Sequence, residues 1–462
     1  MTKVKSKLHF LIYAICSAIG FSYLVLPEKS GFGVVVFMIM QCFFLHLLLP
    51  DKKRLWITVP MFILSCNSFI SANGIWRAAN FIVFVFLYAM LSAEYNSRFW
   101  ISLLENVINP ISKFPLPFQW GMKTTKGKGK VIGRILIALL ITFPVLLVLI
   151  LLLSSADMVF RNEIWNVWKE LRGIIKFSVI RKGIIGIIAG CYLFGSILQC
   201  YRLVPPVKEK AGKQGDLIIF ILLLSGILTV YTAFCIIQFK YLFAGAQLPF
   251  DLTYTEYARK GFFELLFLTG INIFLILLTV FMTKEKKGFG KQIAKVLCSY
   301  LCAITVVLLI SSFYRMYLYC LDDGLTRMRF LVFGFLIFEG IGLLVTFGYI
   351  INPKFSMVTV YAAIALTYYL VLNIIPIDYF VAKSQVDMYL SGKREGVEYV
   401  LTLSEDAAPQ IERLLTSDAK EQAKEFFCYH IERNNEIPNR WQRWNLSDQR
   451  CQNIYDRHFG ES

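Results

Sequence analysis

Charged residues are scarce in this sequence, and their scarcity excludes a chain that is water-soluble over most of its length. Only 17% of the 462 residues are charged, whereas 57% are hydrophobic and the mean hydropathy is +0.59. Soluble globular domains carry about 25% charged residues. We therefore expect lipid to be the solvent for most of the chain.

The residue patterns that usually carry chemistry are also missing. The four histidines, His9, His46, His430 and His458, lie too far apart in the sequence for a local metal-binding set. The glycine-rich basic segment 124–130 lacks the spacing of a phosphate-binding loop, and no G-x-S-x-G elbow is present. The sequence thus predicts no metal and no cofactor, and it argues against an enzyme without excluding one.

Cysteine spacing gives no sign of a metal or redox site, because no C-x-x-C occurs among the eleven cysteines. Nine of them lie in or beside apolar runs, where they are expected to pack as small apolar side chains. Cys428 and Cys451 lie near the C-terminus and can form a disulfide only if that region faces an oxidising compartment. The sequence leaves this pairing open.

The net charge of +17 belongs to the connections between apolar runs. Residues 382–462 are net acidic, so the excess of Lys and Arg lies in the rest of the chain. Basic connections fix the orientation of membrane helices and contact anionic lipid headgroups. We therefore expect a lipid bilayer with anionic headgroups as a partner and no nucleic acid.

Apolar stretches long enough to cross about 30 Å of hydrocarbon recur along the chain. They predict an all-α, polytopic membrane protein with about eleven transmembrane helices and a small soluble helical C-terminal tail. The predicted spans are 8–26, 31–50, 55–73, 76–94, 131–153, 183–201, 216–239, 261–283, 292–314, 329–350 and 355–379.

These spans divide the chain into four regions. Residues 1–94 form an N-terminal four-span region, 95–130 a cytoplasmic loop, 131–381 a seven-span domain and 382–462 the tail. Lys and Arg are more numerous in the connections on the N-terminal side, which predicts a cytoplasmic N-terminus in the cell membrane. An odd number of spans then places the tail outside, and one miscounted span would reverse it.

Two connections and the tail are predicted to be helical. Residues 97–110 and 158–175 place aromatic and aliphatic residues at helical spacing among charges, which is typical of helices lying on a bilayer surface. A helix that binds a protein partner is the alternative for both. In the tail, short helices are expected after Ser404, after Ser417 and from Trp441 to near Asp456, and the tail is a candidate surface for protein partners.

Glu339 is a carboxyl group in the middle of a predicted span. An ionisable side chain near the bilayer centre costs at least about 2.5–3.5 kcal/mol, so it usually faces the interior of a helix bundle and has a partner there. Glu339 is therefore a candidate for ion or proton coupling. A paired structural carboxyl is the alternative.

Two connections predicted to lie outside carry further candidates. In residues 249–264, a capping-box spacing predicts a helix that places Glu256 and Glu264 on one face, with Arg259 beside Glu256. In residues 315–329, Gly324 permits a turn, and the candidate binding residues are Arg315, Asp323, Thr326 and Arg327. These charges form either a binding vestibule or an ion-pair network that holds the helices together.

Three segments resemble a known family. The motifs SSADMVF (154–160), YTEYARKGFFEL (254–265) and RMYLYCLDDGLTRMRF (315–330) are similar to bacterial polytopic membrane proteins grouped as a domain of unknown function, number 4173. The resemblance implies a membrane location and a shared fold, without an activity. An aromatic residue commonly precedes the Gly-Leu-Thr of that family, and here Asp323 takes its place.

Three functions fit this sequence. The first is transport of a small solute or ion through a charged outer vestibule, with Glu339 as the coupling group. The second is a membrane sensor or assembly scaffold that binds protein partners. The third is a membrane-embedded transferase acting on a lipid-linked substrate, with Glu256 or Asp323 as base or metal ligand.

Overall fold

The computed structural model describes residues 7–26, 31–93, 99–124, 177–201, 217–238, 262–283, 288–353, 355–436 and 440–460. Within these ranges every regular element is a helix, which confirms the predicted all-α class. The chain divides into two compact units, which are described separately. Unit 1 comprises residues 1–94, 98–205 and 435–446, and unit 2 comprises 95–97, 206–434 and 447–462.

Unit 1 is built around apolar helices that are joined by a buried polar cluster. Its helices are α1 (Lys7–Gly20) with its continuation η1 (Phe21–Val25), α2 (Phe32–Leu48), η2 (Lys52–Ile57), α3 (Thr58–Ile70), α4 (Gly74–Met90), α5 (Phe99–Ile108), η3 (Asn109–Lys113), α6 (Pro115–Thr124) and α9 (Phe177–Gln199). Gln41 of α2 accepts hydrogen bonds from Tyr13 of α1 at 2.7 Å and Tyr88 of α4 at 2.8 Å, and donates one to Ser17 at 3.1 Å. Three helices are thereby held by one fully buried amide.

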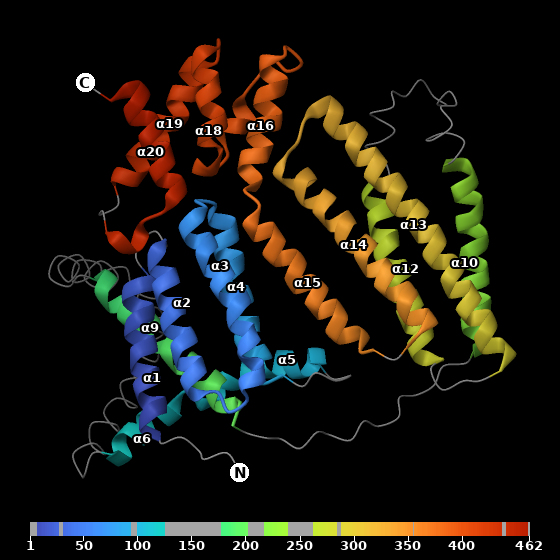
Figure 1. The fold of residues 1–462 in the computed structure, drawn as a ribbon, viewed down its shortest axis with the longest axis horizontal. Helices are drawn as coiled ribbons and strands as arrows, with labels where there is room; N and C mark the ends of the chain where they lie inside the picture. Colours follow the sequence, from blue (N-terminus) through green and yellow to red (C-terminus); the bar gives the residue numbers. More distant parts are fainter. Residues whose placement is uncertain are drawn as a thin grey trace, which may run out of the picture. The chain divides into compact units, whose positions relative to one another are not determined.

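Helix α5 lies across the end of unit 1 rather than along its other helices (Figure 1). Phe99 and Leu103 are buried, whereas Trp100, Leu104 and Ile108 are more than half exposed. An exposed apolar face on a helix that runs across the others fits the predicted interfacial helix at 97–110. The second predicted interfacial helix, 158–175, lies outside the described residues.

Unit 2 contains a bundle formed by α10 (Leu217–Gln238), α12 (Phe262–Met282), α13 (Phe289–Asp323), α14 (Arg327–Ile351) and α15 (Met357–Ile374). Its core combines Leu224 of α10, Ile276 of α12, Leu301 and Leu308 of α13 and Leu343 of α14. Helix α13 has 35 residues, or roughly 52 Å at 1.5 Å per residue, and so exceeds the hydrocarbon thickness.

Seven of the described helices are long and apolar enough to cross a membrane. They are α1 with η1, α9, α10, α12, α13, α14 and α15, and each coincides with a predicted span. Helices α2 and α4 are apolar but shorter, with 17 residues each. The predicted span 131–153 lies outside the described residues, so the polytopic architecture is confirmed and the count of eleven is not.

The last membrane helix ends earlier than the sequence predicted. Helix α15 stops at Ile374, and Pro376 precedes α16 (Ile377–Leu390), whereas the predicted span ran to residue 379. Proline has no backbone N–H to donate to the helix, and its ring clashes with the carbonyl of the preceding turn. Asp378 consequently belongs to the first tail helix.

The tail forms short helices at the three predicted places and one further helix, α17, that was not predicted. They are α17 (Glu398–Leu401), η6 (Glu405–Ala407), α18 (Ala408–Ile411), η7 (Glu412–Thr416), α19 (Lys420–Asn435), η8 (Trp441–Arg443) and α20 (Leu446–Phe459). Cys428 and Cys451 are not joined to each other. The tail core is formed by residues such as Ile411, Phe427 and Ile454, which are nearly or fully buried.

One segment of the tail, residues 440–446, belongs to unit 1. The buried Asn445 side chain donates to the carbonyls of Ser68, at 3.1 Å, and Ser71, at 2.8 Å, at the C-terminal end of α3. These carbonyls have no partner within the helix, so the amide acts as their cap. Phe32 donates its backbone N–H to the Trp444 carbonyl at 2.9 Å, which attaches the start of α2 to the same segment.

Gly31 allows this close backbone approach. A Cβ atom there would lie 2.5 Å from the carbonyl oxygens of Arg443 and Trp444. We predict that Gly31→Ala lowers stability by about 1–3 kcal/mol, because backbone atoms must move apart. Gly74→Ala is the matched control, since nothing lies within 4 Å of a Cβ at Gly74. Apparent unfolding temperatures of the purified variants test this, and equal values for both would contradict it.

Candidate functional site

The turn between α13 and α14 is a local structure that the sequence Asp-Gly-Leu-Thr encodes. Gly324 ends α13 with φ +74°, a backbone conformation that glycine adopts without steric cost, and its N–H donates to Cys320 at 3.0 Å. Thr326 begins α14, and its hydroxyl accepts the backbone N–H of Arg329 at 3.4 Å. The chain thus reverses direction between α13 and α14 within three residues.

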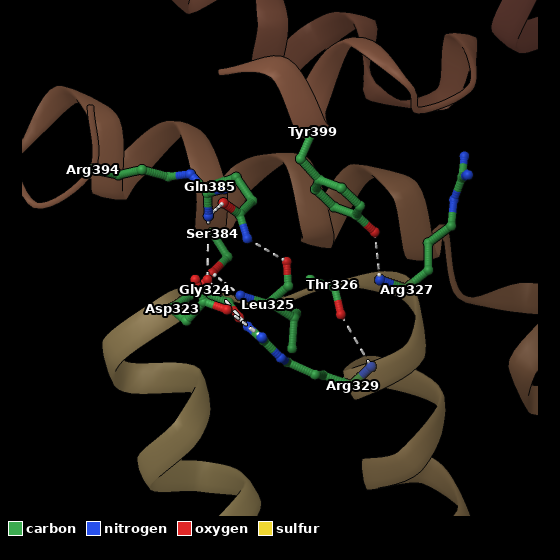
Figure 2. A network of polar contacts seen from close by, with 10 residues as sticks. All are labelled: Asp323, Gly324, Leu325, Thr326, Arg327, Arg329, Ser384, Gln385, Arg394 and Tyr399. Atoms are coloured by element: carbon green, nitrogen blue, oxygen red, sulfur yellow. Dashed lines mark hydrogen bonds and ion pairs between the residues drawn. The ribbon is translucent and has the colours of Figure 1, made fainter. Parts of the chain in front are cut away.

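Arg329 closes this turn from within. Its guanidinium donates to the carboxylate of Asp323 and to the carbonyl of Gly324, and it reaches the Asp323 carbonyl at 3.1 Å (Figure 2). The same guanidinium lies 3.8 Å from the centre of the Tyr319 ring, in a cation–π contact. One cation therefore stabilises both the end of α13 and the start of α14.

Arg327 joins the turn to the tail by a two-pronged ion pair. Its Nε and Nη2 atoms donate to the two carboxylate oxygens of Asp378, each at 2.6 Å. Asp378 also accepts the backbone N–H of Ser404 at 3.1 Å and its hydroxyl at 2.5 Å. Burial alone would raise the pKa of Asp378, but the hydrogen bonds from Arg327 and Ser404 outweigh it and hold the pKa below its ordinary value.

The tail also satisfies the backbone of the turn. Leu325 donates its N–H to the Ser384 hydroxyl at 3.2 Å, and its carbonyl accepts from the Gln385 amide at 2.8 Å (Figure 2). The backbone N–H of Arg327 donates to the Tyr399 hydroxyl at 3.0 Å. Arg394 donates to the Gln385 side chain at 2.6 Å and so keeps that amide in place. Side chains of α16 and α17 therefore take the place of water at the turn.

The structure brings together only some of the predicted site residues. Asp323, Thr326 and Arg327 meet at the turn, whereas Arg315 is buried in α13 and Glu339 in α14. Glu256 and Arg259 lie outside the described residues. Glu264 lies in α12, but its side chain is outside the described part of the structure.

The partners of the turn were missed from the sequence. Asp378, Ser384, Gln385, Arg394 and Tyr399 all come from the tail, more than 50 residues after the turn. The one available signal is Asp378, a lone carboxylate between Pro376 and the end of the last apolar run. A buried acid at that position requires a cation.

A second polar feature runs along the buried face of α12. Thr269, Asn272, Thr279 and Thr283 are each at most 4% exposed and occupy one helix face. Asn272 accepts from Tyr231 of α10 at 3.0 Å and donates to Thr305 of α13 at 3.1 Å. We call these four residues and their partners the α12 polar face.

Glu339 lies at one end of the α12 polar face. Its carboxyl oxygen is 2.6 Å from the Thr269 hydroxyl, which is also 2.8 Å from the Leu266 carbonyl. A hydroxyl has one hydrogen and can donate to only one of these acceptors. Both contacts are hydrogen bonds together when Glu339 carries a proton and donates it to Thr269.

These features define an all-α integral membrane protein with a helical tail docked on its bundle. A family model described as a domain of unknown function (DUF4153) matches residues 15–414. The match covers most of the chain, so the chain belongs to that family. The predicted kind of family is confirmed, whereas the number 4173 is not. No curated protein and no solved structure matches the chain significantly.

Removing the carboxylate that holds the tail is expected to destabilise the docked structure. We predict that Asp378→Asn costs about 3–5 kcal/mol, because it leaves the Arg327 guanidinium without its counter-ion. Asp387→Asn is a matched control on the same helix, since its pair with Arg413 is exposed and is worth about 0–1 kcal/mol. Protease cleavage of the tail and apparent unfolding temperature measure the difference. Similar losses in both variants would show that the buried pair does not hold the tail.

The lowered pKa of Asp378 predicts how its pair with Arg327 contributes to tail docking as the pH changes. A carboxyl whose folded pKa is depressed contributes stability above its unfolded pKa of about 3.9, and that contribution is lost as pH falls through the folded pKa. We therefore expect tail stability to be constant from about pH 8 to 5 and to fall below about pH 4. Hydrogen exchange of α16 and α17 follows this transition. A loss of protection between pH 7 and 5 would mean that another group controls docking.

Proposed function

We propose that the protein transports a small solute or ion, with Glu339 as its coupling group and the α12 polar face as part of the path. The single observation that carries the proposal is the contact of Glu339 with Thr269 inside the bundle. Among the described residues, Glu339 has no ion-pair partner. A carboxyl in this setting is costly as structure alone, which favours a functional role.

Proton binding at Glu339 changes the hydrogen bonding of α12. When the carboxyl is protonated, it donates to Thr269, which donates onward to Leu266. When the carboxylate is ionised, Thr269 must turn its hydrogen toward it, and the Leu266 carbonyl loses that partner. The charge on α14 and the hydrogen bonding of α12 are thereby linked, and a coupled transporter requires a link of this kind.

The proposed path differs from the outer vestibule that the sequence suggested. Asp323, Arg327 and Arg329 are engaged with one another and with the tail, which favours the ion-pair network at that turn. The vestibule remains a prediction for the connection that contains Glu256 and Arg259. We keep it as the outer entrance in this proposal.

The same proposal gives the protein a cytoplasmic N-terminus and an extracytoplasmic tail. In unit 1 the tail segment 440–446 contacts the start of α2 and the end of α3. In unit 2 the tail contacts the α13–α14 turn. The distribution of Lys and Arg assigns all of these helix ends to the outer side, so the contacts support one consistent orientation.

The docked tail supports a second candidate, a membrane sensor or scaffold. In this alternative a protein partner that binds the tail acts on α13 and α14 through Asp378 and the turn. The two functions differ in what Glu339 does, because a scaffold needs no coupling carboxyl.

Uptake by proteoliposomes tests the transport proposal. A defined mixture of amino acids, sugars, organic acids and metal cations is offered at external pH 5.5 and 7.5, and internal contents are quantified by mass spectrometry. We expect a component to accumulate with a pH dependence that Glu339→Gln abolishes. Thr269→Val should slow uptake by about five- to tenfold, equivalent to one lost hydrogen bond.

Thr229→Val is the matched control, because Thr229 is an exposed threonine of α10 whose hydroxyl, within the described part of the chain, donates to the Ser225 carbonyl of its own helix. Its uptake should equal that of the original protein. Unchanged pH dependence in Glu339→Gln would remove this residue from the mechanism. No uptake of any component, together with a partner captured through the tail, would favour the scaffold.

A further inference from the structure

A cleft opens where the end of α12, the start of α13 and the end of α14 meet. It encloses about 440 Å³, a figure that counts the open solvent at its mouth. Its polar lining comes from Thr279 of α12, Thr283 directly after α12, Lys291 and Lys295 of α13 and Tyr349 of α14. The cleft lies at the opposite end of α13 from Asp323.

The charges of the cleft select an anion. Among the residues that the structure describes, ten line the cleft, and they include two lysines and no acidic residue. Within the described part of the chain, Lys295 forms no ion pair with any carboxylate. Lys291 and Lys295 are one helical turn apart on the same face of α13, so both ammonium groups can reach one ligand.

The neutral groups of the cleft are suited to a phosphate with an attached alcohol. Thr279 and Thr283 donate their hydroxyls to carbonyls one turn earlier in α12, at 2.8 and 2.7 Å, so their oxygens remain available to accept. The Tyr349 ring packs on Phe355 at 5.4 Å, which fixes the ring at the edge of the cleft. The lysines thus supply charge and donors, and the two threonines add neutral polar groups to the lining.

The surroundings of the cleft are apolar and exposed. Phe289 is 77% exposed and Val296 67% exposed on α13, and Ile351 is 62% exposed on α14. In a membrane these side chains face lipid, while the length of α13 places its first turns near the headgroups. A phospholipid can therefore place its phosphate in the cleft and its acyl chains along these side chains.

We propose that this cleft binds a phosphate-bearing anion, and that its source is the headgroup of an anionic phospholipid. Basic pockets between membrane helices are a recurrent form of such sites. The inference does not depend on transport. A lipid bound here would contact α12, α13 and α14, which are three of the helices that carry the α12 polar face and Glu339.

Thermal stabilisation of the full-length protein in neutral detergent tests the proposal. Phosphatidylglycerol and phosphatidylcholine are titrated in separate mixed micelles, and inorganic phosphate is titrated alone. A ligand that binds only the folded state raises the apparent unfolding temperature with concentration. We expect phosphatidylglycerol to bind about tenfold more tightly than phosphatidylcholine, and the double variant Lys291→Gln/Lys295→Gln to remove most of this preference.

Three further variants make the result specific. Lys295→Gln alone changes an exposed side chain, so it should fold even if the double variant does not, and it should weaken phosphatidylglycerol binding severalfold. Lys295→Arg keeps the charge and should retain the preference. Lys53→Gln removes an exposed lysine of η2 that does not line this cleft, and should bind like the original protein.

Each outcome decides the proposal. A preference for phosphatidylglycerol that is lost in Lys295→Gln and kept in Lys53→Gln supports the site. Equal stabilisation by both lipids, or an unchanged preference in Lys295→Gln, overturns it. Stabilisation by inorganic phosphate at the same concentration as the lipid supports the phosphate site and overturns the lipid as its source.

Discussion

Hydrocarbon offers no hydrogen-bond partners, and this constraint determines which polar groups can exist inside the bundle. Helices satisfy their own backbone, so only side chains remain to be matched. In unit 1, Gln41 is matched by three hydroxyl groups from two neighbouring helices. In unit 2, Asn272 is matched by Tyr231 and Thr305. These contacts determine which face each helix turns toward its neighbours. Apolar packing alone specifies that orientation poorly, because lipid tails are as apolar as the side chains.

At the ends of the helices the same requirement is met by the tail. A short turn such as 324–326 leaves N–H and carbonyl groups that water would ordinarily satisfy. Here Ser384, Gln385 and Tyr399 satisfy them, and Asp378 neutralises Arg327. The tail is therefore joined to α13 and α14 by hydrogen bonds and an ion pair. A ligand that moves α16 must also act on the turn.

The sequence predicted the parts of this structure that depend on neighbouring residues. The apolar runs located the helices, and Gly324 marked the turn, because hydropathy and φ are local properties. Asp378 was not predicted as the partner of Arg327, because 51 positions separate them and no local sequence pattern links the two residues. The predicted span 292–314 ends at residue 314, where polar residues begin, but α13 continues to Asp323. The helix can continue because its backbone hydrogen bonds do not require apolar side chains. Glu339 could be recognised from the sequence, because a carboxyl group is costly in hydrocarbon. Its partner Thr269 could not, because threonines are common in apolar helices.

The two ends of α13 differ in what a ligand would meet. At the Asp323 end, the polar groups of the turn already hydrogen-bond to protein groups, so a bound solute would have to replace contacts of equal strength. At the Lys291 end, the described residues that line the cleft include two cations and no acid. Binding there adds interactions without breaking an ion pair of Lys295, which favours that end of α13 as the place where a ligand binds. Because α12, α13 and α14 all line the cleft, a ligand that alters their spacing there also alters the surroundings of Glu339, which contacts α12 through Thr269.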